Sequence, residues 1–255
     1  MRLMSNHFTI LIPSYNNEKW AKKCLGSALS QDYENYDVVY INDCSTDNTG
    51  AIVGQLVDET QTKANVLVVN NNSNHKALCN LWREIYQAKN GTIIVTLDGD
   101  DWFPNDQILN ILDQTYSMED VWMTAGSYID NAVGMVSSPN ITGAYWQGNI
   151  RMKPWTISHL RTFRKELFMR IEHADLLDED GNFYKFTFDQ AMMYPMAEMA
   201  GPEHFREIKQ VMYVYNRHNP ISVDRVHRFD QLRIERQIRE KQPYDRIDKL
   251  ELPNG

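Results

Sequence analysis

The sequence has little of what disulfide-bonded or membrane-spanning proteins need. Its 255 residues include three cysteines, Cys24, Cys44 and Cys79, which are too few and too scattered for a disulfide framework or a zinc cluster. An odd count without a recognisable secretion signal favours reduced thiols and a cytoplasmic location. The longest apolar runs, such as 38–41 and 93–95, have the length of strands, far below the roughly 20 residues of a membrane span.

Positive charge is also scarce. The 26 Lys and Arg against 34 Asp and Glu give a net charge of −8, which argues against extended nucleic-acid binding because such binding neutralises phosphates. One short basic run holds Arg161, Arg164, Lys165 and Arg170, and we expect it to be the solvated face of a helix. The hydrophobic share of 42% is that of an ordinary globular chain, long enough for one large domain or two fused subdomains.

Four common catalytic motifs are missing. No G-x-G-x-x-G follows a predicted strand, which argues against a dinucleotide-binding site. The phosphate-binding G-x-x-x-x-G-K-[ST] loop, the H-E-x-x-H zinc helix and the G-x-S-x-G nucleophile turn are absent as well. These absences direct attention to the carboxylates and amides that the chain does contain.

The first hundred residues alternate short β-rich runs with helical segments. The runs cover 9–15, 38–43, 65–70 and 92–98, and the helical segments between them cover 18–30, 46–60 and 76–89. This alternation predicts right-handed βαβ units and a largely parallel sheet. The runs are nearly continuous in apolar residues, as strands covered on both faces should be. The fold class is therefore predicted to be α/β.

After residue 101 the pattern is less regular. We expect a strand over 121–129, a turn-rich stretch over 134–148, a helix over 158–171, an acidic turn over 175–181, a partly helical segment over 186–200 that Pro195 kinks or breaks, a strand over 207–215 and a charged tail helix over 224–241. Three roles stay open for the tail helix: packing on the core, which is our default, pairing with another subunit, and contact with an acidic membrane surface.

Polar residues follow each of the first four predicted strands, at 13–17, 42–45, 70–72 and 98–101. Ligands of open α/β sheets bind outside the carboxyl ends of the strands. Turn and cap preferences explain part of this pattern. They do not explain the last segment, where Asp98, Asp100 and Asp101 repel one another unless a cation or solvent relieves them. The acidic run 178–180, by contrast, lies in a polar turn, and we expect it to be solvated.

The carboxylates of segment 98–101 are suitable ligands for a hard divalent cation. Mg²⁺ and Mn²⁺ take oxygen ligands, and Mg²⁺ is typically held by one or two carboxylates together with substrate phosphates. The segment therefore predicts a site for a nucleotide diphosphate that is bridged to the protein by Mn²⁺ or Mg²⁺.

Three segments, 8–17, 41–49 and 96–101, resemble in order and separation the opening of family 2 glycosyltransferases. The resemblance is strong over about 1–110 and weaker but continuous to about 220. It implies a GT-A fold, a nucleotide-sugar donor and inversion at the anomeric carbon. It also implies a catalytic domain over 1–220, with a donor-binding half at 1–103 and an acceptor-binding half at 104–220, followed by a C-terminal helical tail at 221–255.

The resemblance assigns residues to the nucleotide. Pro13, Tyr15 and Asn16 would line the base pocket, with the Tyr15 ring against the base, and Asp43 would accept a hydrogen bond from the base. A core position for Tyr15 and capping of the following helix by Asp43 are the alternatives. Lys76 lies where the family often places a basic residue near the nucleotide, although the surrounding residues depart from the usual Gly-containing version and a surface lysine remains the alternative.

The resemblance also assigns residues to the diphosphate and the metal. Asp98 and Asp100 would bind the donor, Asp100 through the ribose or the metal, and Asp101 would be the main metal ligand. His218 is a candidate further metal ligand or diphosphate contact, with an ordinary loop residue as the alternative. Arg217 could offset phosphate charge.

An acceptor hydroxyl needs a base to remove its proton during attack. The family usually places this base in a Glu-Asp pair that opens a helix. Here Phe188 replaces the Glu, and Asp189 is the base candidate, with an aspartate stabilised by the helix dipole as the alternative. Trp155 and Trp102 are candidate aromatic platforms for an acceptor sugar, or ordinary core residues.

The sequence therefore predicts a metal-dependent inverting glycosyltransferase. The donor would be a nucleotide sugar, with a UDP-sugar favoured, and the acceptor a hydroxyl of a glycan, a lipid-linked sugar or another molecule. A tail contact with a membrane surface or a second copy stays open. Two other functions are retained. A nucleotidyltransferase would normally show a Gly-rich basic loop where 13–17 stands, and a non-catalytic sugar- or partner-binding module could derive from a transferase.

Overall fold

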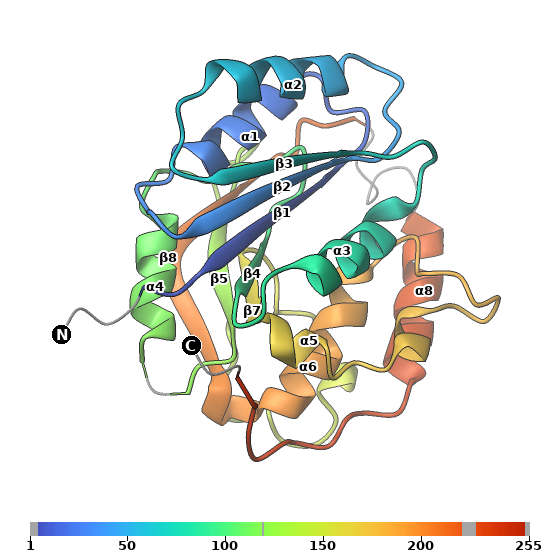
Figure 1. Ribbon diagram of the computed structural model, residues 1–255. Coiled ribbons are helices and arrows are strands. Elements are labelled where there is room, and N and C mark those ends of the chain that lie inside the picture. Colours follow the sequence, from blue (N-terminus) through green and yellow to red (C-terminus); the bar gives the residue numbers. More distant parts are fainter. Residues whose placement is uncertain (1–4, 119, 221–227, 253–255) are drawn as a thin grey trace.

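The computed structural model describes residues 5–118, 120–220 and 228–252. Within these ranges one sheet of eight strands has the order β3-β2-β1-β4-β7-β5-β6, with β8 beside β5 (Figure 1). The strands are β1 (Phe8–Ser14), β2 (Tyr36–Asn42), β3 (Asn65–Asn70), β4 (Ile93–Thr96), β5 (Met123–Asp130), β6 (Val136–Ser137), β7 (Arg161–Arg164) and β8 (Phe205–Tyr215).

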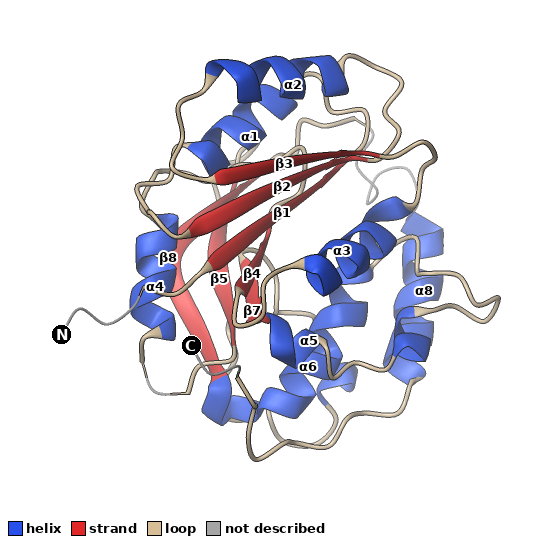
Figure 2. Ribbon diagram, viewed as in Figure 1, coloured by secondary structure: helices blue, strands red, loops and turns tan. Residues whose placement is uncertain are grey.

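The amino-terminal half is the predicted parallel α/β unit. Strands β3, β2, β1 and β4 pair in parallel. Helices α1 (Ala21–Leu29) and α2 (Thr49–Glu59) cover one face of these strands, and α3 (Lys76–Gln87) covers the other (Figure 2). Strand β1 is buried on both faces, because Ile10 belongs to the apolar cluster that contains Leu25 of α1, while Leu11 belongs to the one that contains Leu81 of α3.

The second half of the sheet is mixed. Strand β7 runs antiparallel between β4 and β5, while β5 pairs in parallel with β8. The helical elements of this half are α4 (Ile108–Tyr116), η1 (Ile150–Met152), α5 (Lys165–Phe168), η2 (His173–Leu176), α6 (Phe188–His204) and α8 (Arg228–Glu240). Helix α6, whose residues 190–201 are all buried, contributes more side chains than any other helix to the large apolar cluster beside β5 and β7.

The predicted helix over 158–171 is wrong. The segment forms strand β7 followed by the short helix α5. Thr162 and Phe163 are fully buried in the sheet, where Thr162 lies opposite both Val95 and Thr124. The solvated basic face predicted here is also wrong for Arg161 and Lys165, which are only 2% and 6% exposed. The charged residues of this run suggested a solvated helix. The run instead contains strand β7, which pairs with β4 on one side and with β5 on the other.

Helix α6 does not break at Pro195. Its helical dihedrals are interrupted at Gly201, where φ is 61° and ψ is −177°. Glycine adopts this region because it has no Cβ. The interruption of the helix therefore lies at Gly201, six residues beyond the predicted position, Pro195.

The carboxyl-terminal segment packs on the core. Ile234 and Ile238 of α8, together with Leu250, are buried in the α6 cluster. Residues 224–227 of the predicted tail helix lie outside the described residues. In the described ranges no helix combines the length and apolar character that crossing a bilayer requires. Tail contact with a membrane surface or a second copy stays a prediction.

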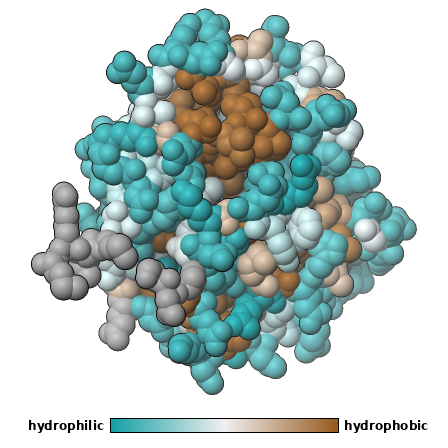
Figure 3. Space-filling model, in the orientation of Figure 1, coloured by the Kyte–Doolittle hydropathy of each residue, from teal (hydrophilic) through white to brown (hydrophobic). Residues whose placement is uncertain are grey.

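The face drawn in Figure 3 is largely hydrophilic, and its largest apolar patch lies in the upper middle. Figure 1 places β3 in that region, at the end of the strand order. Leu67 of β3 is 52% exposed, while Val66, Val68 and Val69 are partly buried. The outermost strand of the parallel half therefore carries an exposed apolar side chain, Leu67.

Candidate active site

Hydrogen bonds join the loops that follow β1 and β2. The amide of Asn16 donates to Ser45 Oγ at 3.0 Å, and its Oδ1 accepts from the amide of Thr46 at 2.8 Å. The next amide, that of Asn17, donates to Thr49 Oγ1 at 2.8 Å. Two of the polar strand ends singled out in the sequence thus form one connected rim. Pro13, also predicted to line the base pocket, is partly buried at the end of β1.

Tyr15 stands exposed on this rim. Its side chain is 41% exposed, so a core role is wrong for this residue. The ammonium of Lys76, at the start of α3, lies 5.7 Å from the centre of the Tyr15 ring. Lys76 is itself exposed, in agreement with the surface alternative, and an aromatic face and a cation stand side by side at the carboxyl edge of the sheet.

Asp43 is buried and holds the start of α3. Its Oδ1 accepts from the amide of His75 and from Asn71 Nδ2, both at 2.9 Å, and its Oδ2 accepts from the amide of Lys76 at 2.8 Å. Burial acts to raise the pKa of Asp43, but these hydrogen bonds outweigh it and lower the pKa below its ordinary value. Asp43 therefore caps α3 and not α2, the helix that follows it directly, so the capping alternative is wrong about the helix. Its contact with a nucleotide base stays a prediction.

Strand β8 and the loop after it hold segment 98–101. Asp101 is 1% exposed, and its two carboxylate oxygens accept from the Tyr213 hydroxyl at 2.6 Å and the Asn216 amide at 2.7 Å. Burial, reinforced by Asp100 and Asp98, raises the pKa of Asp101 well above its ordinary value despite these bonds. The Asp100 carboxylate accepts from Asn219 Nδ2 at 2.7 Å.

Gly99 allows this segment to lie against β1. A Cβ at this position would stand 2.5 Å from both Cβ and Oγ of Ser14, and the Ser14 hydroxyl also accepts from Tyr40. We expect Gly99→Ala to lower the free energy of unfolding by about 1–3 kcal/mol, since the segment must shift in a packed region. Denaturant unfolding measures this loss.

Gly54→Ala is the matched control for that experiment. Gly54 lies inside α2, and no heavy atom would lie within 4 Å of its added Cβ. Alanine there should raise stability by roughly 0.5–1 kcal/mol because it favours the helix over glycine. Equal behaviour of the two variants would contradict the close approach at Gly99.

Arg161 joins segment 98–101 to α6. It lies on β7 beside the end of β4 and is 2% exposed. Its Nη2 lies 3.3 Å from Asp98 Oδ2, and its Nη1 lies 3.2 Å from Asp189 Oδ2. Asp189, in the first turn of α6, is thereby brought to the acidic segment. Burial raises the pKa of Asp189, and Arg161 opposes this only in part.

The sequence interpretation missed Arg161 because it assigned the residue to a helix. The segment itself carried no signal for this position, since the burial of Thr162 and Phe163 is known only from the structure. A buried guanidinium needs a carboxylate partner. Segment 98–101 and Asp189 supply two.

His159 was also missed. Its ring stacks on Tyr213 and Tyr215, with centroid separations of 4.4 and 5.3 Å, and its Nδ1 forms no hydrogen bond with any described residue. Ligand atoms of Asp98, Asp101 and His159 lie within 4.8 Å of one another. Burial, and then the charge of Arg161, lower the pKa of His159 well below its ordinary value, so the ring is neutral at pH 7.

A divalent cation fits this trio. Two carboxylates and a neutral imidazole are suitable ligands for Mn²⁺, and the Nδ1 without a hydrogen-bond partner offers a lone pair. Among the residues that the structure describes, Asp100 and His218 are not part of this grouping. His218 is exposed on the loop after β8, and its metal role stays a prediction.

The two predicted aromatic platforms lie in packed surroundings. Trp102 is 8% exposed, stacks on Trp20 at 6.5 Å, and has the Lys23 ammonium 3.6 Å from its ring centre. Trp155 is partly buried and meets Tyr194 of α6 edge to face at 5.0 Å. Trp155 therefore keeps an accessible part, whereas little of Trp102 is available to a sugar.

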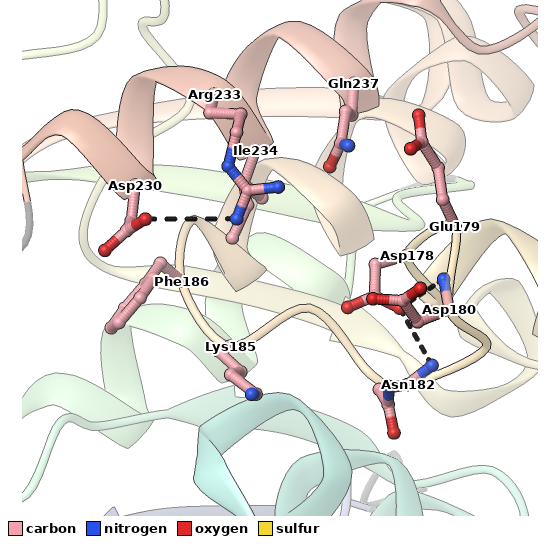
Figure 4. Close-up of a pocket in the computed structure, with 10 residues that line it drawn as sticks. All are labelled: Asp178, Glu179, Asp180, Asn182, Lys185, Phe186, Asp230, Arg233, Ile234 and Gln237. Atoms are coloured by element: carbon pink, nitrogen blue, oxygen red, sulfur yellow. Dashed lines mark hydrogen bonds and ion pairs between the residues drawn. The ribbon is translucent and has the colours of Figure 1, made fainter.

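A surface pocket of about 270 Å³ lies between the acidic turn and α8 (Figure 4). Arg233 and Gln237 line it from α8, and Lys185 lines it from the opposite wall. The predicted solvated turn 178–180 forms part of its rim. Asp178 Oδ1 accepts from the amides of Asp180 and Asn182 at 3.0 and 2.9 Å, so its charge stabilises the turn itself.

Solved structures resemble this fold. Staphylococcus aureus TarS 1-349 in complex with UDP has a TM-score of 0.63 at 20% identity, over 91% of this chain and 65% of that one. The mannosyltransferase PcManGT from Pyrobaculum calidifontis, in complex with GDP-Man and Mn²⁺, has a TM-score of 0.62 at 18% identity, over 95% and 68%. The protein has the GT-A type of α/β fold.

Sequence comparison identifies the family. The model described as "Glycosyl transferase family 2" matches residues 9–180, and the chain belongs to this family. Glycosyltransferase GlyA of Streptococcus pneumoniae serotype 4 is 29% identical over 107 residues, 42% of this chain and 14% of the relative. The uncharacterized glycosyltransferase EpsJ of Bacillus subtilis is 23% identical over 234 residues, 86% and 63% of the two chains. The chain spans less than half of the length of the first relatives, such as GlyA and TarS.

Proposed function

We propose that this protein transfers a sugar from a nucleotide sugar, with a UDP-sugar favoured, to a hydroxyl of a carbohydrate or glycoconjugate acceptor, with inversion at the anomeric carbon. The observation that carries the proposal is the Asp98–Arg161–Asp189 arrangement, which unites the acidic strand end with the base candidate. The UDP complex of TarS and the GDP-Man and Mn²⁺ complex of PcManGT support the choice of donor class.

The donor half would use the rim at the carboxyl edge of the sheet. The exposed Tyr15 ring offers a face for the base, and Lys76 beside it offers a charge for phosphate. Asp98, Asp101 and His159 would hold a divalent cation, with Asp100 and His218 as the predicted further ligands. When bound there, the cation would neutralise charge that develops on the leaving diphosphate.

The acceptor half would use Asp189 as the general base. The acceptor oxygen attacks the anomeric carbon from the face opposite the diphosphate, and the carbon–oxygen bond to the diphosphate breaks. The hydroxyl proton moves to a carboxylate oxygen of Asp189. Burial favours this transfer because it raises the pKa of the carboxyl, while Arg161 opposes that increase and so favours the ionised form that accepts the proton.

Calorimetry with UDP tests the donor site. We expect Mn²⁺ to tighten UDP binding clearly, and UDP-sugar turnover to release UDP. In a non-catalytic module, Mn²⁺ would not change the affinity for UDP. A nucleotidyltransferase, which the family assignment disfavours, would release pyrophosphate from a nucleoside triphosphate instead.

A pair of histidine variants distinguishes the two metal sets. His159→Phe keeps a ring stacked on Tyr213 but removes the nitrogen ligand. We expect it to weaken the Mn²⁺ dependence of UDP binding, while His218→Ala leaves the dependence largely intact. The reverse result would favour the metal set predicted from the sequence over the Asp98, Asp101 and His159 trio.

A further inference from the structure

We propose that Arg161 is a positioning residue that fixes the base Asp189 relative to the donor-binding Asp98. The inference rests on the proposed function and adds to it a physical link between the donor and acceptor halves. One guanidinium contacts both carboxylates, at 3.3 and 3.2 Å, from a position that is 2% exposed.

The fold fixes where this guanidinium stands. Strand β7 runs antiparallel to β4, so the start of β7 lies beside the end of β4, where segment 98–101 begins. The Arg161 carbonyl accepts from Thr96 Oγ1 at 3.4 Å, two residues before Asp98. The sheet therefore sets the backbone of Arg161 against the acidic segment.

The Arg161 side chain also contacts α6. Its guanidinium carbon lies 5.7 Å from the centre of the Phe188 ring, the residue before Asp189. Its Nε makes no hydrogen bond within the described part of the chain, so the two Nη contacts orient the group. A planar fork reaches two carboxylates at once, whereas the single ammonium of lysine is a point charge.

Arg161→Lys is the informative variant because it keeps the positive charge and loses the fork. We expect kcat for sugar transfer to fall by about 10- to 100-fold, since a small displacement of a base is costly. Affinity for UDP with Mn²⁺, measured by calorimetry, should change much less. In an Asp189→Asn background the same substitution should add little further loss, because the base through which Arg161 acts is already gone.

Arg164→Lys is the matched control. Arg164 lies on the same strand, but its Nε donates to the Val121 carbonyl at 2.8 Å and its Nη2 to that of Tyr116 at 3.5 Å. This variant should keep wild-type kcat. Wild-type kcat in Arg161→Lys would overturn the inference. So would a kcat loss in the double variant equal to the product of the losses in Arg161→Lys and Asp189→Asn.

A measurement without substrate separates this inference from the proposed function. If the wild-type protein transfers no sugar, the proposed function fails. Denaturant midpoints of Arg161→Lys, Asp189→Asn and the double variant still decide whether the two side chains interact. Strongly non-additive losses would support the link, and simple additivity would overturn it.

Discussion

Asp189→Asn should lower kcat for sugar transfer by about 10²- to 10⁴-fold, which is the usual contribution of a general base. The amide keeps the size of the side chain but cannot take the acceptor proton. UDP affinity in the presence of Mn²⁺ should be retained, because the donor rim is built from other loops. Release of UDP from a UDP-sugar, with acceptor and without it, measures the effect.

Asp58→Asn provides the control, since Asp58 is exposed on α2. It should leave kcat unchanged. Near-normal turnover of a folded Asp189→Asn protein would show that another group removes the proton.

The pH dependence of kcat gives an independent check on Asp189. Burial raises the pKa of this carboxyl above its ordinary value. The base works only when ionised, so turnover should be low below the raised pKa and should increase as the pH rises through it. The residual turnover of Asp189→Asn should lack this acid limb. An unchanged limb would assign it to another group.

Arg151→Met should destabilise the protein by about 3–5 kcal/mol, because it leaves Glu198 as a buried charge without its partner. Arg151 is 1% exposed, and its Nε and Nη2 donate to the two carboxylate oxygens of Glu198 at 2.7 and 2.8 Å. Its Nη1 donates to the Ile238 carbonyl of α8 at 2.8 Å. The pair therefore connects η1, α6 and the carboxyl-terminal helix, and denaturant unfolding should report the loss.

Two further variants test whether burial is the cause. Arg236→Met removes an exposed arginine of α8 that pairs with Glu240 at 2.7 Å, and it should leave the unfolding midpoint close to wild type. Arg151→Met combined with Glu198→Leu removes both buried charges and should recover much of the lost stability. A midpoint for Arg151→Met as high as that of Arg236→Met would contradict the predicted role of the pair.

The amino-terminal half could be predicted almost element by element. Strands β1, β2 and β4 are buried and bounded by polar turns, so the local pattern and the tertiary environment agree. Strand β3 has the predicted limits, 65–70, and α3 starts at the predicted residue, Lys76. A core position for Tyr15 and capping of the following helix by Asp43 were both wrong, because Tyr15 is exposed and Asp43 caps α3 instead of α2.

Segment 158–171 could not be predicted in this way. Its charged residues suggested a solvated helix, yet pairing with β4 and β5 makes it a strand. Arg161 and His159 therefore took part in no hypothesis about the site. What buries them is contact with segments far away in the sequence, such as 98–101, Asp189 and Tyr213, and no periodicity within the segment records that contact.

The sequence by itself determined the α/β class, the acidic strand end and the family resemblance, because each depends on residues close together in the chain. Only the tertiary structure decided which carboxylates, guanidinium and imidazole meet. A buried charge is stabilised by partners within a few ångströms, and here those partners come from the segment after β4 and from β7, α6 and β8. Distances across a folded sheet are set by strand order and direction, which local sequence patterns do not specify.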